Sequence, residues 1–294
     1  MIALGIHHKT TYRYRQPVSL WPHRLMLRPR ESRAIRLISS QLVTAPAANI
    51  TWASDVFDNA VATATFQTAS DQLVIDSMMQ IELDALPWPV FDIAASAIVY
   101  PFQYSDDEWT DLGALTAQRY ADPTDQFRSW AKGFVRGPTT DTLSLLKDLN
   151  GDLFTRIAYE VREDQGTQSP SRTLDRGQGS CRDFAVLFVE AARSLGFGAR
   201  IVSGYLYDPQ QNLIGSRGSG STHAWSEVYV PGAGWITFDP TNNRVGGDNL
   251  IPVAVGRTIR QIMPVSGDFV GMTDAFESMS VEVVVKPWKP PSVL

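Results

Sequence analysis

Residues 177–243 constrain the fold more than any other part of this sequence, because a helical pattern there is followed by a strand pattern. Two glycines precede Ser180, a good helix N-cap residue, and they predict a break in the chain before it. From Cys181 onward, apolar residues recur at helical spacing, and Gly196 is a typical stop signal. We therefore predict a helix that begins at Cys181 and ends before Gly196.

The second half of the segment shows the period-two alternation of β-strands. His223, Trp225 and Glu227 alternate with small or apolar residues, and residues 231–234 predict a tight reversal into a return strand. If the connecting loop has an odd number of residues, Asp239 shares a face with His223 and lies opposite Trp225 or Glu227. An even number places Asp239 on the other face. Diagonal partners in an antiparallel pair have Cα atoms about 7–8 Å apart, within reach of an imidazole–carboxylate hydrogen bond.

Cys181, the only cysteine in the sequence, lies in the first turn of the predicted helix. Unpaired backbone amides and the helix dipole favour an anion there, and a nearby imidazolium lowers the pKa of a thiol. Each residue also has a structural explanation: a buried apolar cysteine, a histidine bonded to a backbone carbonyl, and an Asp-Pro turn. Taken together, Cys181, His223 and Asp239 predict a Cys–His–Asp triad.

The motifs of this segment resemble those of the transglutaminase-like superfamily, whose fold is the papain-like cysteine-enzyme fold. They are G-x-C-x-D-x-A on the helix, H-A-W-x-E-V on the strand and G-W-x-x-x-D-P-T on the return strand. Residues 196–205 resemble the strand that follows the nucleophile helix in that family. The resemblance implies that Cys181 is the nucleophile, that His223 is the base and then the acid, and that Asp239 orients the imidazole.

The predicted oxyanion hole includes the backbone amide of Cys181 at the helix N-terminus. Gln178 is a candidate second donor, because papain-like enzymes use an upstream glutamine, although Gln178 lies closer to the cysteine than theirs. Trp225 is expected to shield the His–Asp bond from water while packing in the sheet. Polar loops at residues 163–176 and 215–221 are expected to form the walls of a substrate cleft. Further oxyanion or cleft candidates are Ser180, Tyr205 and Arg217.

Residues 1–90 predict a β-rich N-terminal domain, because alternating stretches are separated by turn residues. Its H-x-T-x-Y-x-Y pattern, which begins at His8, and its Asp58-Asn59 turn resemble the β-rich N-terminal region of bacterial transglutaminase-like proteins. A metal site at the N-terminal histidines is not expected, because neighbouring strand residues point to opposite faces and no carboxylate cluster accompanies them.

The expected fold class is α+β, with a nucleophile helix packed on an antiparallel sheet in a papain-like, transglutaminase-like core. Helices are predicted from a capping box at Ser105, from an N-cap at Asp122, and through residues 143–153 with an interruption at Gly151. Residues 281–285 predict a C-terminal strand, and the sequence leaves its partner open. The expected units are a β-rich domain at 1–90, a linker at 91–104, the catalytic core at 105–265, and a C-terminal strand and tail at 266–294.

Composition excludes several classes of partner. The chain has 294 residues and a net charge of −5, with 26 basic and 31 acidic residues and no basic block, so neither nucleic acid nor an acidic membrane is expected. A single cysteine excludes an intrachain disulfide, and no signal-peptide pattern or membrane-length apolar run is found, so the expected location is the cytoplasm. No cofactor or metal is expected, and the oligomeric state is left open.

Three functions are compatible with these observations. The favoured one is a bacterial cysteine peptidase or amidase, a hydrolase that cleaves peptide or isopeptide amides through a Cys181 thioester. The second is a protein-glutamine transglutaminase, in which an amine replaces water as the acceptor. The third is a non-catalytic peptide-binding module, which the intact triad disfavours. In each case the expected partner is a peptide or protein.

Overall fold

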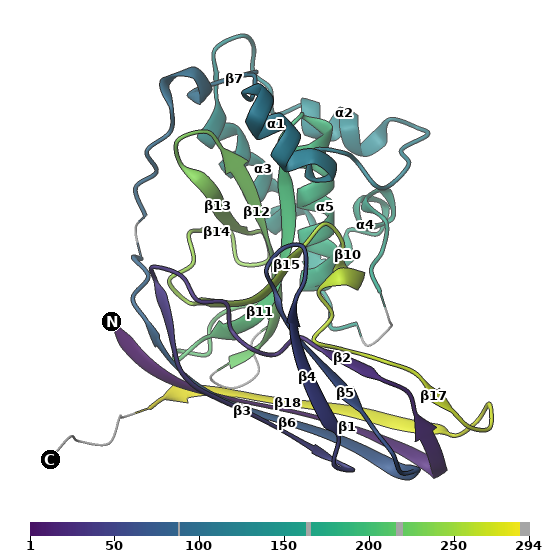
Figure 1. The fold of residues 1–294 in the computed structure, drawn as a ribbon. Helices are drawn as coiled ribbons and strands as arrows, with labels where there is room; N and C mark the ends of the chain where they lie inside the picture. The colour runs from purple at the N-terminus through teal and green to yellow at the C-terminus, as the bar shows by residue number, and fades with distance from the viewer. Residues whose placement is uncertain (88, 163–165, 216–219, 289–294) are drawn as a thin grey trace, which may run out of the picture.

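The computed structural model describes residues 1–87, 89–162, 166–215 and 220–288. The two ends of the chain build a β-sandwich, and the middle of the chain builds a second unit in which helices cover one antiparallel sheet (Figure 1). No helix in the described part of the chain is long and apolar enough to cross a membrane.

The first sheet of the sandwich is built around β1, a long strand that pairs antiparallel with β6, β17 and β18. Alternate residues of β1, including Leu4, Ile6, His8 and Thr10, are buried on its inner face. This burial explains the alternation seen in the sequence. The strands of this sheet are β1 (Ile2–Leu20), β3 (Ile35–Ala45), β6 (Ser70–Leu83), β17 (Phe269–Val270) and β18 (Phe276–Pro287).

A second sheet, in the order β16-β2-β5-β4, closes the sandwich over residues of β1 and β6. Its strands are β2 (His23–Leu25), β4 (Asn49–Ser54), β5 (Ala60–Thr65) and β16 (Val265–Ser266). Tyr14, Leu25, Ala64 and Leu73 are among the side chains that bury the space between the two sheets. The β-rich N-terminal domain predicted from the sequence is therefore a two-sheet sandwich.

The C-terminal strand returns to this domain rather than to the core. β18 pairs with β1 over eleven positions, which place Val281 opposite Thr10 and Val285 opposite Ile6. The structure thus answers the question that the sequence left open. Residues 265–287 belong to the N-terminal sandwich and are not a separate C-terminal unit, whereas the last six residues of the predicted tail lie outside the described residues.

The predicted linker packs against the core. It contains η1 (Ala95–Ala97) and β7 (Val99–Tyr100), which pairs with β8 (Thr140–Asp141). The hydroxyl groups of Tyr100 and Tyr104 donate to the carbonyl oxygens of Leu195 and Tyr229, each at 2.7 Å. The segment is therefore bound to the core and does not act as a free connection.

Five α-helices are described between residues 106 and 194, and three of them correct the sequence predictions. α2 begins three residues later than predicted, after Asp125 in the left-handed region (φ 53°), although the Asp122 carboxylate still accepts from the backbone amides of Gln126 and Arg128. α3 continues through Gly151. α4 occupies the end of a segment predicted as loop, with Ser169 as its N-cap. The helices are α1 (Asp106–Leu112), α2 (Gln126–Lys132), α3 (Thr142–Arg156), α4 (Pro170–Arg176) and α5 (Cys181–Ser194); short 3-10 turns are η2 (Gly113–Leu115) and η3 (Ile259–Gln261).

The core sheet has the strand order β14-β13-β12-β11-β15 and is antiparallel throughout. α5 packs on one face of this sheet, where Phe188 meets Phe238 with ring centroids 5.1 Å apart. The predicted α+β class, with the nucleophile helix on an antiparallel sheet, is confirmed. The strands are β9 (Ala158–Tyr159), β10 (Gln178–Gly179), β11 (Ala199–Tyr207), β12 (Gly220–Val230), β13 (Gly234–Asp239), β14 (Arg244–Val245) and β15 (Leu250–Gly256), with β9 and β10 forming a separate parallel pair.

Candidate active site

Cys181 is the first residue of α5, directly after the short strand β10. The turn into the helix is tight, since a Cβ atom on Gly179 would lie 2.9 Å from the Cβ of Asp183. Cys181 is partly exposed, although the rest of the first turns of α5 are largely buried. The thiol thus belongs to the first residue of a helix, at the N-terminus that the sequence predicted.

A buried carboxylate fixes this helix start. Asp183 is fully buried, and its Oδ2 accepts from both the backbone amide and the hydroxyl of Ser180, at 2.9 and 2.8 Å. Its Oδ1 accepts from the backbone amide of Gln168 at 2.7 Å, and Arg162 Nη1 lies 3.0 Å from both carboxylate oxygens. The Asp183 carboxylate therefore joins the nucleophile turn to the segment that precedes α4.

The hairpin of β12 and β13 has the odd loop on which the sequence prediction depended. Val230 pairs with Gly234, so three residues, 231–233, form the loop, and Ser226 pairs with Phe238. Continuing this register by one step places Asp239 opposite Trp225 and diagonal to His223. The two side chains therefore share one face of the hairpin.

His223 and Asp239 form a buried pair. Nε2 of His223 donates to Oδ2 of Asp239 at 3.0 Å, and the two residues are 3% and 1% exposed. The same carboxylate accepts from the side-chain amide of Asn242 at 2.9 Å and from the backbone amide of Thr241 at 3.1 Å. These donors hold the carboxylate in place and compensate its burial.

The second ring nitrogen of His223 is left for the thiol. Nδ1 is buried and has no hydrogen-bond partner of nitrogen or oxygen type among the described residues. Burial opposes ionisation of Cys181, but hydrogen bonding to His223, the histidine charge and the backbone amide of Ala224 together lower the pKa of the thiol. The histidine thus has the carboxylate on one side and the sulfur on the other.

These contacts determine the pKa values of His223, Asp239 and Cys181. Desolvation lowers the pKa of His223, but the charges of Asp239 and Cys181 and the bonds to both raise that pKa to about 10. Burial opposes ionisation of Asp239 as well, and His223 nevertheless holds the pKa of that carboxyl below its usual value. A lowered thiol pKa and a raised imidazole pKa favour a thiolate–imidazolium ion pair near neutral pH.

Trp225 lies against the imidazole. The two rings are nearly parallel, at 25°, with centroids 6.2 Å apart, and Trp225 is 1% exposed. Its side chain belongs to a cluster with Val202, Leu206 and Val255 on the sheet face opposite α5. Trp225 therefore lies beside the imidazole and packs in the sheet.

The remaining residues predicted to line the oxyanion hole or the cleft do not all lie at the site. Ser180 is buried and its hydroxyl is bonded to Asp183, so it does not line a cleft. Tyr205 corrects the prediction, because its side chain is fully buried at the domain contact, with its oxygen 3.0 Å from Nδ1 of His8. Gln178 is exposed in β10, three residues before Cys181. Arg217, together with most of the 215–221 loop, lies outside the described residues.

Sequence reasoning missed two parts of the site. The first is Asn242, whose signal is its position three residues after Asp239 in an Asp-Pro-Thr-Asn turn. The second is the contact of Asp183 with Arg162 and Gln168. Asp183 is part of the G-x-C-x-D-x-A motif, but nothing in the sequence indicates partners 21 and 15 residues upstream.

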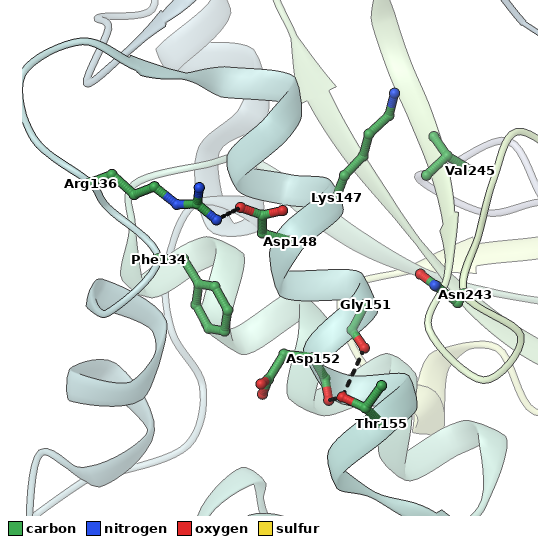
Figure 2. Close-up of a pocket in the computed structure, with 9 residues that line it drawn as sticks. All are labelled: Phe134, Arg136, Lys147, Asp148, Gly151, Asp152, Thr155, Asn243 and Val245. Atoms are coloured by element: carbon green, nitrogen blue, oxygen red, sulfur yellow. Dashed lines mark hydrogen bonds and ion pairs between the residues drawn. The ribbon is translucent and has the colours of Figure 1, made fainter.

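A surface depression lies away from Cys181. Figure 2 shows that nine residues of α2–α3 and of the turn after β13 surround it, with Arg136 and Asp148 paired at 2.6 Å along one side. Its volume is about 630 Å³. It approaches the triad only through Asn243, the neighbour of Asn242. Among the described residues, no cluster of histidine, cysteine and carboxylate side chains could hold a metal ion.

The nucleophile helix packed on an antiparallel sheet, with a helix-terminal thiol beside a buried histidine–aspartate pair, has the architecture of the papain-like cysteine-enzyme fold. The chain superposes on the crystal structure of a candidate cysteine protease from Cytophaga hutchinsonii with a TM-score of 0.73 and 18% identity, over 99% of this chain and 94% of that one. Residues 128–240 match the transglutaminase-like superfamily, and residues 4–82 match the bacterial transglutaminase-like N-terminal region. The protein is therefore a bacterial-type member of the transglutaminase-like superfamily, a cysteine-dependent enzyme family, as its motifs indicated.

Two mycobacterial relatives extend over nearly the whole chain. An uncharacterized protein of Mycobacterium tuberculosis (strain H37Rv) is 26% identical over 95% of this chain and 91% of its own length. An uncharacterized protein of Mycobacterium leprae is 24% identical over 92% of this chain and 94% of its own length. The sandwich and the core therefore occur together in these relatives.

Proposed function

We propose that this protein is a thiol-dependent acyl-transfer enzyme that hydrolyses peptide or isopeptide amides through a thioester on Cys181. The observation that supports the proposal is the buried His223–Asp239 pair, which leaves Nδ1 of the ring for the thiol. The pKa of Cys181 is lowered and that of His223 is raised, which suits activation of the thiol. In this proposal Cys181 is the nucleophile, His223 is the acid and base, and Asp239 orients the imidazole.

In the first half of the reaction, the Cys181 thiolate attacks the amide carbonyl and forms a carbon–sulfur bond. The backbone amide of Cys181, at the N-terminus of α5, donates to the developing oxyanion. The exposed amide of Gln178 is the proposed second donor. As the tetrahedral intermediate collapses, Nδ1 of His223 gives its proton to the nitrogen, the carbon–nitrogen bond breaks, and the amine leaves.

In the second half, the neutral imidazole takes a proton from water at Nδ1, and the resulting hydroxide attacks the thioester carbonyl. The carbon–sulfur bond then breaks, which releases a carboxylic acid and restores the thiolate–imidazolium pair. Asp239 accepts from Nε2 throughout, so the tautomer of His223 that exposes Nδ1 to the reactants is maintained.

Water is the proposed acceptor because the structural neighbour from Cytophaga hutchinsonii is described as a candidate cysteine protease. The protein, with a Cys181→Ala control, would be incubated with a peptide library, with and without a primary amine, and the product masses measured. Hydrolysis predicts shorter peptides that require Cys181. Loss of ammonia with gain of the amine would instead support a transglutaminase. Unchanged masses in every case would support a peptide-binding module.

A further inference from the structure

A turn of the N-terminal sandwich, residues 55–59, reaches the core sheet. Asp55 Oδ1 accepts from the backbone amides of Phe57 and Asn59, at 2.9 and 3.0 Å. Nη1 of Arg30 donates to the carbonyl oxygens of Phe57 and Asp58 and to Oδ1 of Asn59, at 2.9, 3.0 and 2.7 Å. The turn thus has a fixed shape before any contact with the core is considered.

The turn is bonded to the outer edge of the core sheet. Asn59 is fully buried; its Nδ2 donates to the carbonyl oxygen of Val255 at 2.7 Å, and its Oδ1 accepts from the amide of the same residue at 2.8 Å. The backbone amide of Arg30 donates to the carbonyl oxygen of Pro252 at 2.8 Å. Because β15 is an edge strand, these bonds supply partners that a neighbouring strand would otherwise provide. Figure 1 shows the β4–β5 connection rising to β15.

The same turn also contacts the hydrophobic cluster that includes Trp225, the neighbour of His223. Phe57 packs against the cluster of Trp225, Val202, Leu206 and Val255, on the sheet face opposite α5. Trp225 has no room to retreat toward β11, since a Cβ atom on Gly204 would lie 2.7 Å from Cη2 of its ring. The cluster that contains the indole therefore packs against Phe57, and the indole in turn lies nearly parallel to the imidazole of His223.

We propose that the 55–59 turn of the N-terminal domain positions the His223 imidazole through Phe57 and Trp225, so that the sandwich is a working part of the active site. The inference rests on the proposed function, because it concerns the same imidazole. The ionisable groups that act on His223 are Asp239 and Cys181, and neither belongs to the turn. Phe57 is thus a positioning residue that acts through packing and not through charge.

The test compares three variants of the turn in the full-length chain, using alkylation of the single thiol as the readout. Phe57→Ala removes the packing contact, Phe57→Leu retains most of its volume, and Val56→Ala alters a neighbour that is 92% exposed. The rate of Cys181 alkylation by iodoacetamide would be measured against pH. Phe57→Ala is expected to react on the order of tenfold more slowly below neutral pH, with its profile shifted toward that of a free cysteine. Phe57→Leu, which keeps only part of the packing contact, should show a smaller shift in the same direction, and Val56→Ala should resemble the wild type.

A folded Phe57→Ala variant with a wild-type profile would overturn the inference, and melting curves would establish that it is folded. If Phe57→Ala does not fold, a Phe57→Leu profile displaced from that of Val56→Ala would support the inference, and identical profiles would overturn it. Failure of the proposed function has a different signature, because the wild-type thiol would then already titrate like a free cysteine.

Discussion

Two buried aspartates flank the Cys–His pair, and they differ in what they hold. Asp239 accepts from the ring of His223 and from the amide of Asn242 at the end of a hairpin. Asp183 accepts from Ser180 and Gln168 and pairs with Arg162 at the start of the nucleophile helix. One carboxylate faces a group that changes charge during the proposed reaction, and the other faces a permanent cation. Burial of a carboxylate therefore does not by itself indicate a catalytic role.

The largest effect is expected for Asp239→Ala, which leaves the imidazole without its orienting acceptor. The rate constant for acylation should fall by about 10³-fold or more, with a much smaller change in folding stability. Single-turnover kinetics with an activated ester substrate would measure it. Asp239→Asn keeps an acceptor for Nε2 without the charge, so a smaller loss is expected. Wild-type kinetics in both variants would contradict the assignment of Asp239.

The next effect is expected for Asp183→Asn, and it should fall on stability. The substitution removes the buried carboxylate that pairs with Nη1 of Arg162 at 3.0 Å, and the Arg162 side chain is itself 11% exposed. Removing one partner of such a buried pair costs about 3–5 kcal/mol. Urea unfolding followed by circular dichroism would measure the change. A variant as stable as the wild type but inactive would mean that Asp183, like Asp239, serves catalysis and not stability.

A smaller loss is expected for Asn242→Ala, which removes one donor to the Asp239 carboxylate. A hydrogen bond to a charged group contributes about 1.5–3 kcal/mol, so kcat/KM should fall about tenfold or somewhat more. Asn212→Ala, a change at an exposed loop asparagine, is the matched control and should retain full activity. Equal kinetics in Asn242→Ala and Asn212→Ala would show that Asn242 does not contribute to the active site.

The smallest effect is expected for Ser180→Ala. The change removes the hydroxyl that donates to Asp183, whereas the backbone amide of residue 180 still donates to the same oxygen. We expect a loss of about 1 kcal/mol in the free energy of unfolding and little change in kcat. Thermal melting would measure the first quantity. A loss of activity without a loss of stability would instead indicate that Ser180 contacts the substrate.

Local patterns predicted the parts of the site that lie close together in the sequence. The helix start at Cys181 and the odd hairpin loop before Asp239 depend on turn residues and strand alternation, which the sequence displays directly. The partner of β18 depends on a pairing over more than 260 residues of chain, and alternation does not specify a partner strand. The sequence predicts Tyr205 as a cleft residue, and no local pattern reveals its burial against His8, which lies 197 residues upstream.

The central claim is that Cys181 and His223 form a thiolate–imidazolium pair, and a titration of the thiolate tests it most directly. Its ultraviolet absorbance would be followed against pH in the wild type and in His223→Ala, with Cys181→Ser as the blank. We expect the wild-type thiolate to be present well below the free-cysteine pKa of about 8.5, because the histidine keeps its proton up to a pKa of about 10. In His223→Ala the thiolate should appear only near or above the free-cysteine value. A wild-type thiol that titrates like the variant would contradict the account.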